Sequence, residues 1–304
     1  MIRGSRRYLR PDAIARIARL ELRARAVVEG VLAGLHKSPF KGQSVAFLQH
    51  REYAPGDDLR RVDWKVWARQ DRLTVKEFEE ETDLRLTLLV DGSASMDYAA
   101  DRPAVPRLGK YDCAATLAAS LAWLALSHGD AVGCAVFDDR LRGAVPARTA
   151  RSHLASIVEL LERPRAGRAT AFAPVLRQVA ETLPPRGLVV VVTDLLGDRD
   201  GVFQGLRLLR KRGHDLVLLH VMDDDELDFP FTGPTRFEGL ELPEHVACNP
   251  RALRAGYMAA LEAFLAEARR RAATDRCDYA LVRTGEPVDA ALVKLLSRRA
   301  SMAV

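Results

Sequence analysis

The sequence predicts an α/β fold of the doubly wound, Rossmann-like type with a mainly parallel sheet. Two apolar runs, LRLTLLVD at 84–91 and GLVVVVTDLLG at 187–197, are continuous rather than alternating, as in strands that are covered on both faces of a parallel sheet. From residue 84 onward, such runs alternate with segments whose apolar residues recur at helical spacing. Strands that alternate with helices of about ten to twenty residues indicate βαβ units, and therefore this class of sheet.

The predicted elements follow one another in regular alternation. The predicted strands are 84–91, 131–137, 141–145, 187–197, 215–221 and 277–282, and the predicted helices are 111–127, 150–162, 173–182, 202–211, 250–273 and 288–299. The strand at 141–145 is expected at the edge of the sheet, in a hairpin with the strand before it. Residues 223–249 interrupt the alternation and are predicted to be an insertion with one or two short hairpins. The DDDE run at 223–226 lacks the glycine and the spacing of a calcium loop and indicates a solvated acidic turn.

The first 83 residues have a different character and are predicted to form an N-terminal extension of the domain at 84–304. A helix is expected from residue 12 to about 35, with Asp12 as its N-cap. The segment 44–83 is rich in charge and aromatic residues: a P-G-D-D turn precedes a short helix through Trp67, and an extended passage follows near Val75. The tryptophans are expected to pack on the sheet domain. A partner-protein surface and, more remotely, a single-stranded nucleic-acid surface are alternative interpretations.

The composition is that of an ordinary soluble globular protein. Hydrophobic residues make up 48% and charged residues 29% of the 304 residues, and the net charge of +5 results from 46 basic and 41 acidic side chains that are largely interleaved. A nucleic-acid partner is therefore not expected. The four cysteines form no C-x-x-C pair, which disfavours a zinc site and fits a reducing compartment. Without a signal peptide or an apolar run of about eighteen residues, a cytoplasmic protein with no membrane span is expected.

Acid and hydroxyl side chains follow the strand at 84–91 in the stretch DGSAS, a D-x-S-x-S pattern. Asp91, Ser93 and Ser95 supply one carboxylate and two hydroxyls, and Asp194 at the end of the other buried strand supplies a second acid. A loop before a predicted helix adds the hydroxyl of Thr170. Mg²⁺ prefers hard oxygen ligands with one or two direct carboxylates. We therefore expect these five side chains to hold Mg²⁺ or Mn²⁺.

Competing chemistries lack essential parts. A G-x-S-x-G nucleophile elbow would need glycine where Ser95 stands, and a D-x-D phosphatase would need an acid where Ser93 stands. Nucleotide-binding glycine motifs are absent, and no histidine is placed to act as a base. An open metal position without a base favours binding over turnover, so we do not expect an enzyme. A metal-assisted hydrolase and an adaptor with an empty, degenerate site remain the alternatives.

The order of these residues is similar to the metal-ion-dependent adhesion site of von Willebrand factor A-like domains. From about residue 20 onward, the chain also resembles the bacterial family called "domain of unknown function 58". In that family such a domain follows a Y-x-P-G-D-D-x-R-x-x-D-W motif. The motif falls here on Pro55, Gly56, Asp57, Asp58, Arg60, Asp63 and Trp64, and the metal site falls on Asp91, Ser93, Ser95, Thr170 and Asp194.

The resemblance implies a function in protein complexes. The metal would accept an Asp or Glu from a partner protein, and the family points to MoxR-type AAA+ ATPases as partners in chaperone-like work, complex maturation or stress response. Longer members of the family carry membrane spans that this chain lacks. Many relatives have valine and glycine at the positions of Gly92 and Ala94, so a flexible Gly92 is expected to loosen the loop that holds the ion.

Overall fold

The computed structural model describes Leu20, Val66 and residues 45–52, 74–80, 84–99, 107–165, 169–241 and 243–302. The predicted helix at 12–35, the P-G-D-D turn and the family-motif residues from Pro55 to Trp64 lie outside the described residues, as does Trp67. The predicted division of the chain at residue 84, between an N-terminal extension and the sheet domain, stays a prediction.

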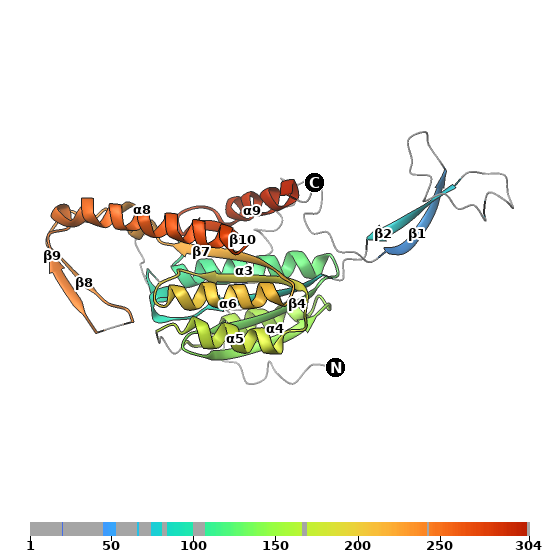
Figure 1. Cartoon of the computed structure of the whole chain (residues 1–304), viewed down its shortest axis with the longest axis horizontal. Coiled ribbons are helices and arrows are strands. Elements are labelled where there is room, and N and C mark those ends of the chain that lie inside the picture. Colours follow the sequence, from blue (N-terminus) through green and yellow to red (C-terminus); the bar gives the residue numbers. More distant parts are fainter. Residues whose placement is uncertain are drawn as a thin grey trace.

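A six-stranded sheet forms the centre of the molecule (Figure 1). Its strand order is β10-β7-β6-β3-β4-β5, and every neighbouring pair is parallel except β4 and β5. The strands are β3 (Arg85–Asp91), β4 (Ala131–Phe137), β5 (Leu141–Arg148), β6 (Gly187–Thr193), β7 (His214–Met222) and β10 (Cys277–Arg283). The predicted doubly wound α/β fold and the predicted β4–β5 edge hairpin are therefore confirmed.

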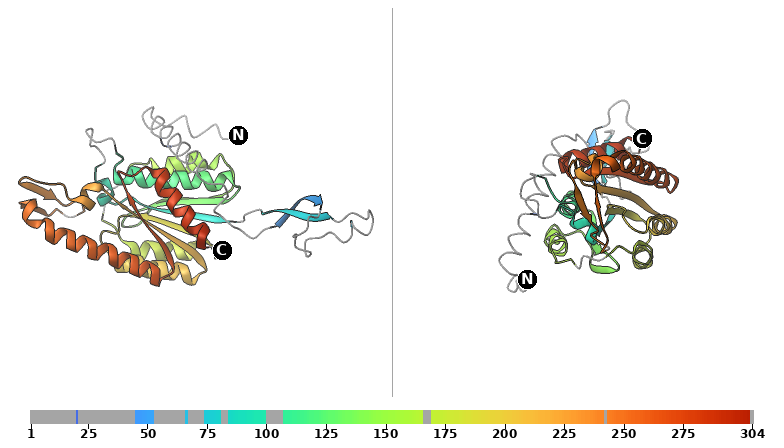
Figure 2. Two further views of the ribbon diagram at one scale, coloured as in Figure 1. Left: turned by 90° about the horizontal axis from the view of Figure 1, so that it is seen from above. Right: turned by 90° about the vertical axis from the view of Figure 1, so that its left-hand side faces the viewer.

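Helices cover both faces of the sheet, as the end-on view shows (Figure 2). Buried residues of one cluster come from α3 (Lys110–Ser127), α4 (His153–Leu161) and α9 (Val288–Met302). Those of the other cluster come from α5 (Phe172–Thr182), α6 (Arg199–Lys211) and α8 (Pro250–Thr274). This two-sided cover explains why the central strands β3, β4 and β6 are continuously apolar, because neither of their faces meets water.

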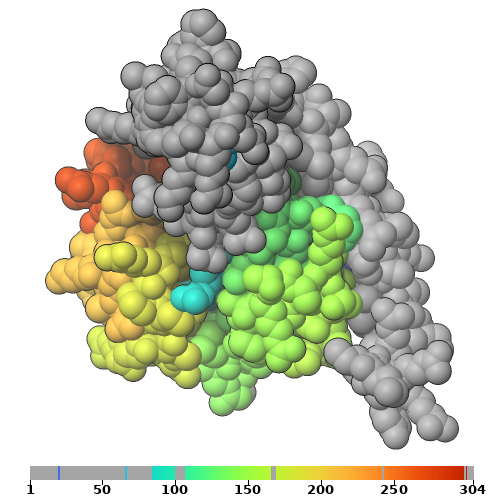
Figure 3. Space-filling view, turned by 90° about the vertical axis from the view of Figure 1, so that its right-hand side faces the viewer, coloured from blue at the N-terminus to red at the C-terminus, as the bar shows by residue number. Residues whose placement is uncertain are grey.

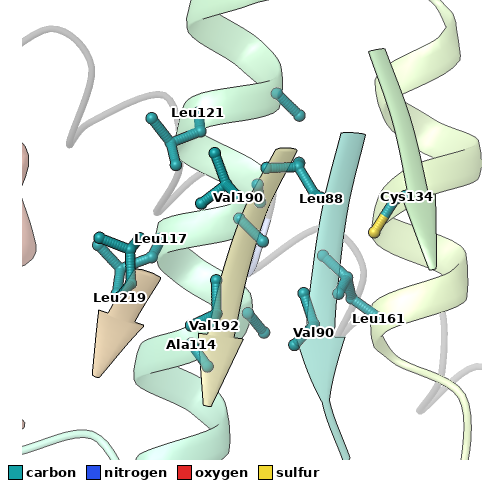
Figure 4. Packing of buried hydrophobic residues seen from close by; sticks show 14 of the residues in the cluster. Leu88, Val90, Ala114, Leu117, Leu121, Cys134, Leu161, Val190, Val192 and Leu219 are labelled. Atoms are coloured by element: carbon teal, nitrogen blue, oxygen red, sulfur yellow. The ribbon is translucent and has the colours of Figure 1, made fainter. Parts of the chain in front are cut away.

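Strand β3 shows how alternate residues fill the two cores. Leu88 and Val90 belong to the cluster under α3, whereas Leu89 belongs to the cluster under α5 and α6. On the α3 side, the close view shows Leu88 and Val90 beside Val190 and Val192 of β6 (Figure 4). Each fully buried aliphatic side chain of this kind contributes roughly 1.5–3 kcal/mol of transfer free energy. The middle of the sheet is thus a rigid platform for the loops at its ends.

The two ends of the parallel strands differ in chemistry. Figure 3 views the side on which β3 begins, and the cyan start of this strand lies there between green and yellow segments. At the opposite, carboxyl ends, an aspartate closes or directly follows each of the four strands β3, β4, β6 and β7: Asp91, Asp138, Asp194 and Asp223. All four are buried. Ligands of open α/β sheets bind at this carboxyl edge.

The insertion after β7 contains a short helix and one described hairpin. The hairpin pairs β8 (Thr235–Glu238) with β9 (His245–Cys248), as predicted. The solvated acidic turn is wrong, because residues 224–228 form the helix α7 (Asp224–Asp228). Asp223 caps this helix in a capping box with Glu226, and Arg107 lies 3.0 Å from Asp223 and 2.7 Å from Asp225. Pairing with a basic side chain far away in the sequence is what makes burial of these acids possible.

A separate antiparallel ribbon joins β1 (Val45–Glu52) and β2 (Thr74–Glu80). The expected extended passage near Val75 is confirmed as β2, but β1 was not predicted, because its charged residues obscure the alternation typical of a strand. Among the described helices, none combines the length and the apolar character that a membrane span requires.

Candidate metal and partner-binding site

The loop after β3 is fixed by hydrogen bonds to both neighbouring strands. Asp91 is fully buried; its Oδ1 accepts the Ser93 N–H at 2.9 Å, and its Oδ2 accepts the hydroxyl of Thr193 in β6 at 2.7 Å. On the other side, the Gly92 N–H donates to the carbonyl of Phe137 in β4 at 2.7 Å. A Cβ at Gly92 would lie only 3.0 Å from a methyl group of Val136. Gly92 therefore allows close packing here, and the expected loosening of the loop stays a prediction.

The two serine hydroxyls of the motif lie side by side. Ser93 and Ser95 are both buried, and their hydroxyls form a hydrogen bond with the Oγ atoms 3.0 Å apart. Adjacent ligands of an octahedral Mg²⁺ ion, with metal–oxygen distances of about 2.1 Å, are separated by about 3.0 Å. The hydroxyl pair consequently has the spacing of one edge of such an octahedron.

Thr170 and Asp194 bring further oxygens to the same end of the sheet. Thr170 lies just before α5, and the next residue, Ala171, donates its N–H to the carbonyl of Asp138 at the end of β4. The main chain of Thr170 also lies close to Gly197, in the loop after β6. Since β3 lies between β4 and β6, the Thr170 loop crosses the end of β3. The structure thus places all five predicted residues at one edge.

One of these side chains presents a buried oxygen that lacks a hydrogen bond within the described part of the chain, Thr170 Oγ1, whereas Asp194 Oδ2 lies 2.7 Å from the ammonium of Lys110. The other carboxylate oxygen of Asp194 accepts the N–H of Leu196 at 3.0 Å. An unsatisfied buried oxygen costs free energy unless water or an ion completes its shell. The Thr170 hydroxyl therefore fits a site that binds a cation and its waters.

The pKa of Asp91 is strongly perturbed. Burial, and then the nearby charge of Asp194, raise the pKa of Asp91 from 3.8 to about 7, although the hydrogen bonds from Thr193 and Ser93 act in the opposite direction. Two acids that repel one another in a water-poor site favour either a proton or a cation between them. Near neutral pH, the site is therefore prepared for a cation.

Lys110 and Glu226 belong to this environment and were missed by sequence reasoning. The ammonium nitrogen of Lys110, the first residue of α3, lies 2.7 Å from Asp194 Oδ2 and 2.9 Å from Glu226 Oε1. Its side chain is 0% exposed. Burial lowers the pKa of Lys110, but the charges of Asp194 and Glu226 outweigh it, so the net shift is upward. A lysine at a helix start carries no sequence signal for such a partner, because lysine is common on helix surfaces.

His220 also touches the site, where sequence reasoning placed no histidine. It lies inside β7, with Nε2 2.9 Å from the main-chain oxygen of Asp194 and Nδ1 2.7 Å from the hydroxyl of Tyr279. Burial lowers the pKa of His220 to about 4. Both nitrogens are engaged and the ring is neutral at physiological pH, so His220 holds the Asp194 main chain in place.

The described residues contain no cluster of three or more His, Cys, Asp or Glu side chains with metal-binding geometry. Any ion at this edge therefore depends on the hydroxyls of Ser93, Ser95 and Thr170 beside the acids. Such a mixed set of hard oxygens suits Mg²⁺ and Mn²⁺ better than soft metals. The residues present fit the predicted ion, and the family-motif residues from Pro55 to Trp64 lie outside the described part.

The fold and the site together define a class of protein. A parallel sheet with one antiparallel edge strand, and an acid-and-hydroxyl loop at the carboxyl end of a central strand, characterise a von Willebrand factor A-like domain. A family model described as "Protein of unknown function DUF58" matches residues 49–267. The chain belongs to this family.

Similar proteins are known from bacteria. Uncharacterized proteins of Mycobacterium bovis and Mycobacterium tuberculosis are 29% identical over 235 residues, which cover 76% of this chain and 72% of the relative. Among solved structures, the conserved hypothetical protein BatB from Bacteroides thetaiotaomicron is 15% identical with a TM-score of 0.43, over 72% of this chain and 99% of BatB. The SpRpn10 VWA domain is 10% identical with a TM-score of 0.38, over 69% of this chain and 93% of that domain.

Proposed function

We propose that this protein is a metal-dependent protein-interaction module whose ion is Mg²⁺ or Mn²⁺. The observation that carries the proposal is the pair of buried hydroxyls of Ser93 and Ser95, 3.0 Å apart, beside the buried acid Asp91. The buried hydroxyl of Thr170, which lacks a hydrogen bond within the described residues, supports it. Together with Asp194, these side chains would hold the ion directly or through water. When bound, the ion would supply a coordination position for a carboxylate of a partner.

The partner we propose is a MoxR-type AAA+ ATPase that offers an Asp or Glu side chain. The resemblance to the family supports this choice, and complex maturation or stress response is the corresponding cellular role. The protein's contribution at the site is positional: hydrogen bonds from Ser93 and Thr193 hold the carboxylate of Asp91. The preformed loop means that a partner need not order it on binding.

Hydrolysis finds no support at the site. The histidine beside Asp194 is His220, whose two ring nitrogens are bound to Tyr279 and to a main-chain carbonyl. With its pKa lowered to about 4 by burial, it would be a weak base. Binding rather than turnover is therefore the function that we propose.

A chelator-dependent pull-down tests this function. Immobilised wild-type protein is expected to retain a MoxR-type ATPase from the same genome in Mg²⁺ and to lose most of it in EDTA. The double variant Ser93→Ala/Ser95→Ala removes two proposed ligands and should retain little ATPase in either buffer. Ser127→Ala is the matched control, because the Ser127 hydroxyl donates within α3 to the carbonyl of Trp123, and it should behave as wild type.

Equal retention in Mg²⁺ and in EDTA would contradict metal-dependent binding, even if the ATPase proved to be a partner. Circular dichroism of the double variant shows whether a loss of binding results from misfolding.

A further inference from the structure

A buried lysine ammonium already occupies part of the proposed site. Lys110 Nζ forms a hydrogen bond with Glu226 Oε1 at 2.9 Å and an ion pair with Asp194 Oδ2 at 2.7 Å. The same ammonium therefore pairs with two carboxylates. The three side chains come from the start of α3, the end of β6 and the helix α7. A single ammonium thus connects three elements at the carboxyl edge of the sheet.

Other contacts hold this ammonium in position. The second oxygen of Glu226 accepts the N–H of Asp223 at 2.8 Å, and the Glu226 carbonyl accepts the hydroxyl of Tyr257 at 2.7 Å. The Lys110 N–H donates to the carbonyl of Tyr98 at 3.2 Å. The Lys110 main chain and the Glu226 side chain are therefore both held in place. The lysine side chain cannot turn outward without leaving Glu226 with an unpaired, largely buried charge.

The positive charge of this ammonium affects the binding of a metal ion at the proposed site. At the end of β6, Lys110 neutralises Asp194, one of the acids proposed to hold the ion. A divalent ion that approached Asp91, Ser93 and Ser95 would meet this positive charge across the site. Like charges in a poorly solvated environment repel strongly, because little water screens them.

We propose that Lys110 is a resident cation of the site that keeps it assembled without metal and weakens its affinity for divalent ions. This inference rests on the proposed metal-binding function. It also gives the adaptor with an empty site a physical basis, since the ammonium balances the acids when no ion is bound. Binding of the ion by the protein alone then requires a higher metal concentration. A partner carboxylate that completes the ion's coordination shell contributes a larger share of the total affinity.

Calorimetric titration with Mg²⁺ and with Mn²⁺ tests the proposal. Removal of the ammonium in Lys110→Met is expected to tighten binding about tenfold or more, because one positive charge beside the ion is lost. Lys110→Gln is a second neutral variant that can still donate a hydrogen bond to Glu226, should Lys110→Met fold poorly. Lys211→Met, at the exposed end of α6, removes the same charge elsewhere and should leave the affinity unchanged.

A second measurement needs no metal. In EDTA, Lys110→Met and Asp194→Asn should each lower the denaturation midpoint, and the double variant should lose clearly less than the sum of the two, because each partner is left unpaired without the other. Strictly additive losses would contradict the role of Lys110 in holding the site together.

The outcomes separate the two proposals. Tighter metal binding by the neutral Lys110 variants supports the resident cation, and if the wild type then shows no binding at all, the metal-dependent function fails while the lysine proposal stands. Equal affinity in the wild type and the variants overturns the lysine proposal and leaves the proposed function intact. No binding by any of the proteins overturns both.

Discussion

Asp91 is the residue whose chemistry most constrains the site. Its carboxyl is fully buried, and its pKa is raised from 3.8 to about 7, first by burial and then by the charge of Asp194. Since the folded protein holds this proton more tightly than the unfolded chain does, the contribution of Asp91 to stability is complete below about pH 4 and is lost as the pH rises through 7.

The variant Asp91→Asn tests this linkage in chelator. The neutral amide does not bear the cost of burying a charge, so Asp91→Asn should be more stable than wild type at pH 8, by roughly a few kcal/mol. At pH 5, where wild-type Asp91 is protonated, the two proteins should differ little. Urea denaturation at both pH values measures the difference, and a pH-independent difference would show that Asp91 keeps its ordinary pKa.

Sequence could identify the ligand-type residues of the site but not its basic residue. Asp91, Ser93 and Ser95 lie within five positions after a recognisable strand, so their proximity follows from local geometry alone. Lys110 meets Glu226 across 116 residues, and nothing in either local sequence encodes that contact. The same reason explains why the DDDE run was interpreted as solvated: the partner of its acids, Arg107, is remote in sequence.

At the scale of elements, strands and helices with a continuous apolar pattern were predictable to within a few residues. β3 ends at Asp91 and β4 spans Ala131–Phe137, as their apolar runs indicate. β1 and α7 were not predictable in this way, because neither has such a pattern: β1 is a charged strand, and α7 is a five-residue helix that depends on its capping box. Short elements of this kind are stabilised by contacts rather than by propensity.

The packing of α5 on α6 gives a prediction at this scale. A Cβ at Gly205 of α6 would lie 2.4 Å from the Cβ of Leu176 in α5, so the helices can approach only because this residue is glycine. Gly205→Ala should lower the free energy of unfolding by about 1–3 kcal/mol, as measured by thermal or urea denaturation.

Gly256 in α8 is the matched control for this substitution. No described atom lies within 4 Å of a Cβ built at this position, so Gly256→Ala should instead stabilise the protein by about 0.5–1 kcal/mol through helix propensity. Equal effects at the two positions would show that the close approach of α5 and α6 is not what requires glycine.

At the scale of the whole molecule, the sheet is apolar on its two covered faces and polar at the carboxyl ends of its strands. The central strands are covered on both faces by two separate cores. This rigid frame positions four buried aspartates at the carboxyl ends of neighbouring strands. Burial of several acids is tolerated because each meets a donor or a base: Thr193 for Asp91, Arg142 for Asp138, Lys110 for Asp194 and Arg107 for Asp223. The fold therefore concentrates negative charge where a cation, whether resident or metallic, can balance it.

The measurement that tests this account most directly is anomalous diffraction from crystals grown with Mn²⁺. We expect an anomalous peak between the hydroxyls of Ser93, Ser95 and Thr170, at about 2.2 Å from the oxygens that bind the ion, with Lys110 still beside Glu226. A peak at another place would contradict the metal site on which the proposed function depends. The absence of a peak at Mn²⁺ concentrations well above the dissociation constant measured by calorimetry would contradict it as well.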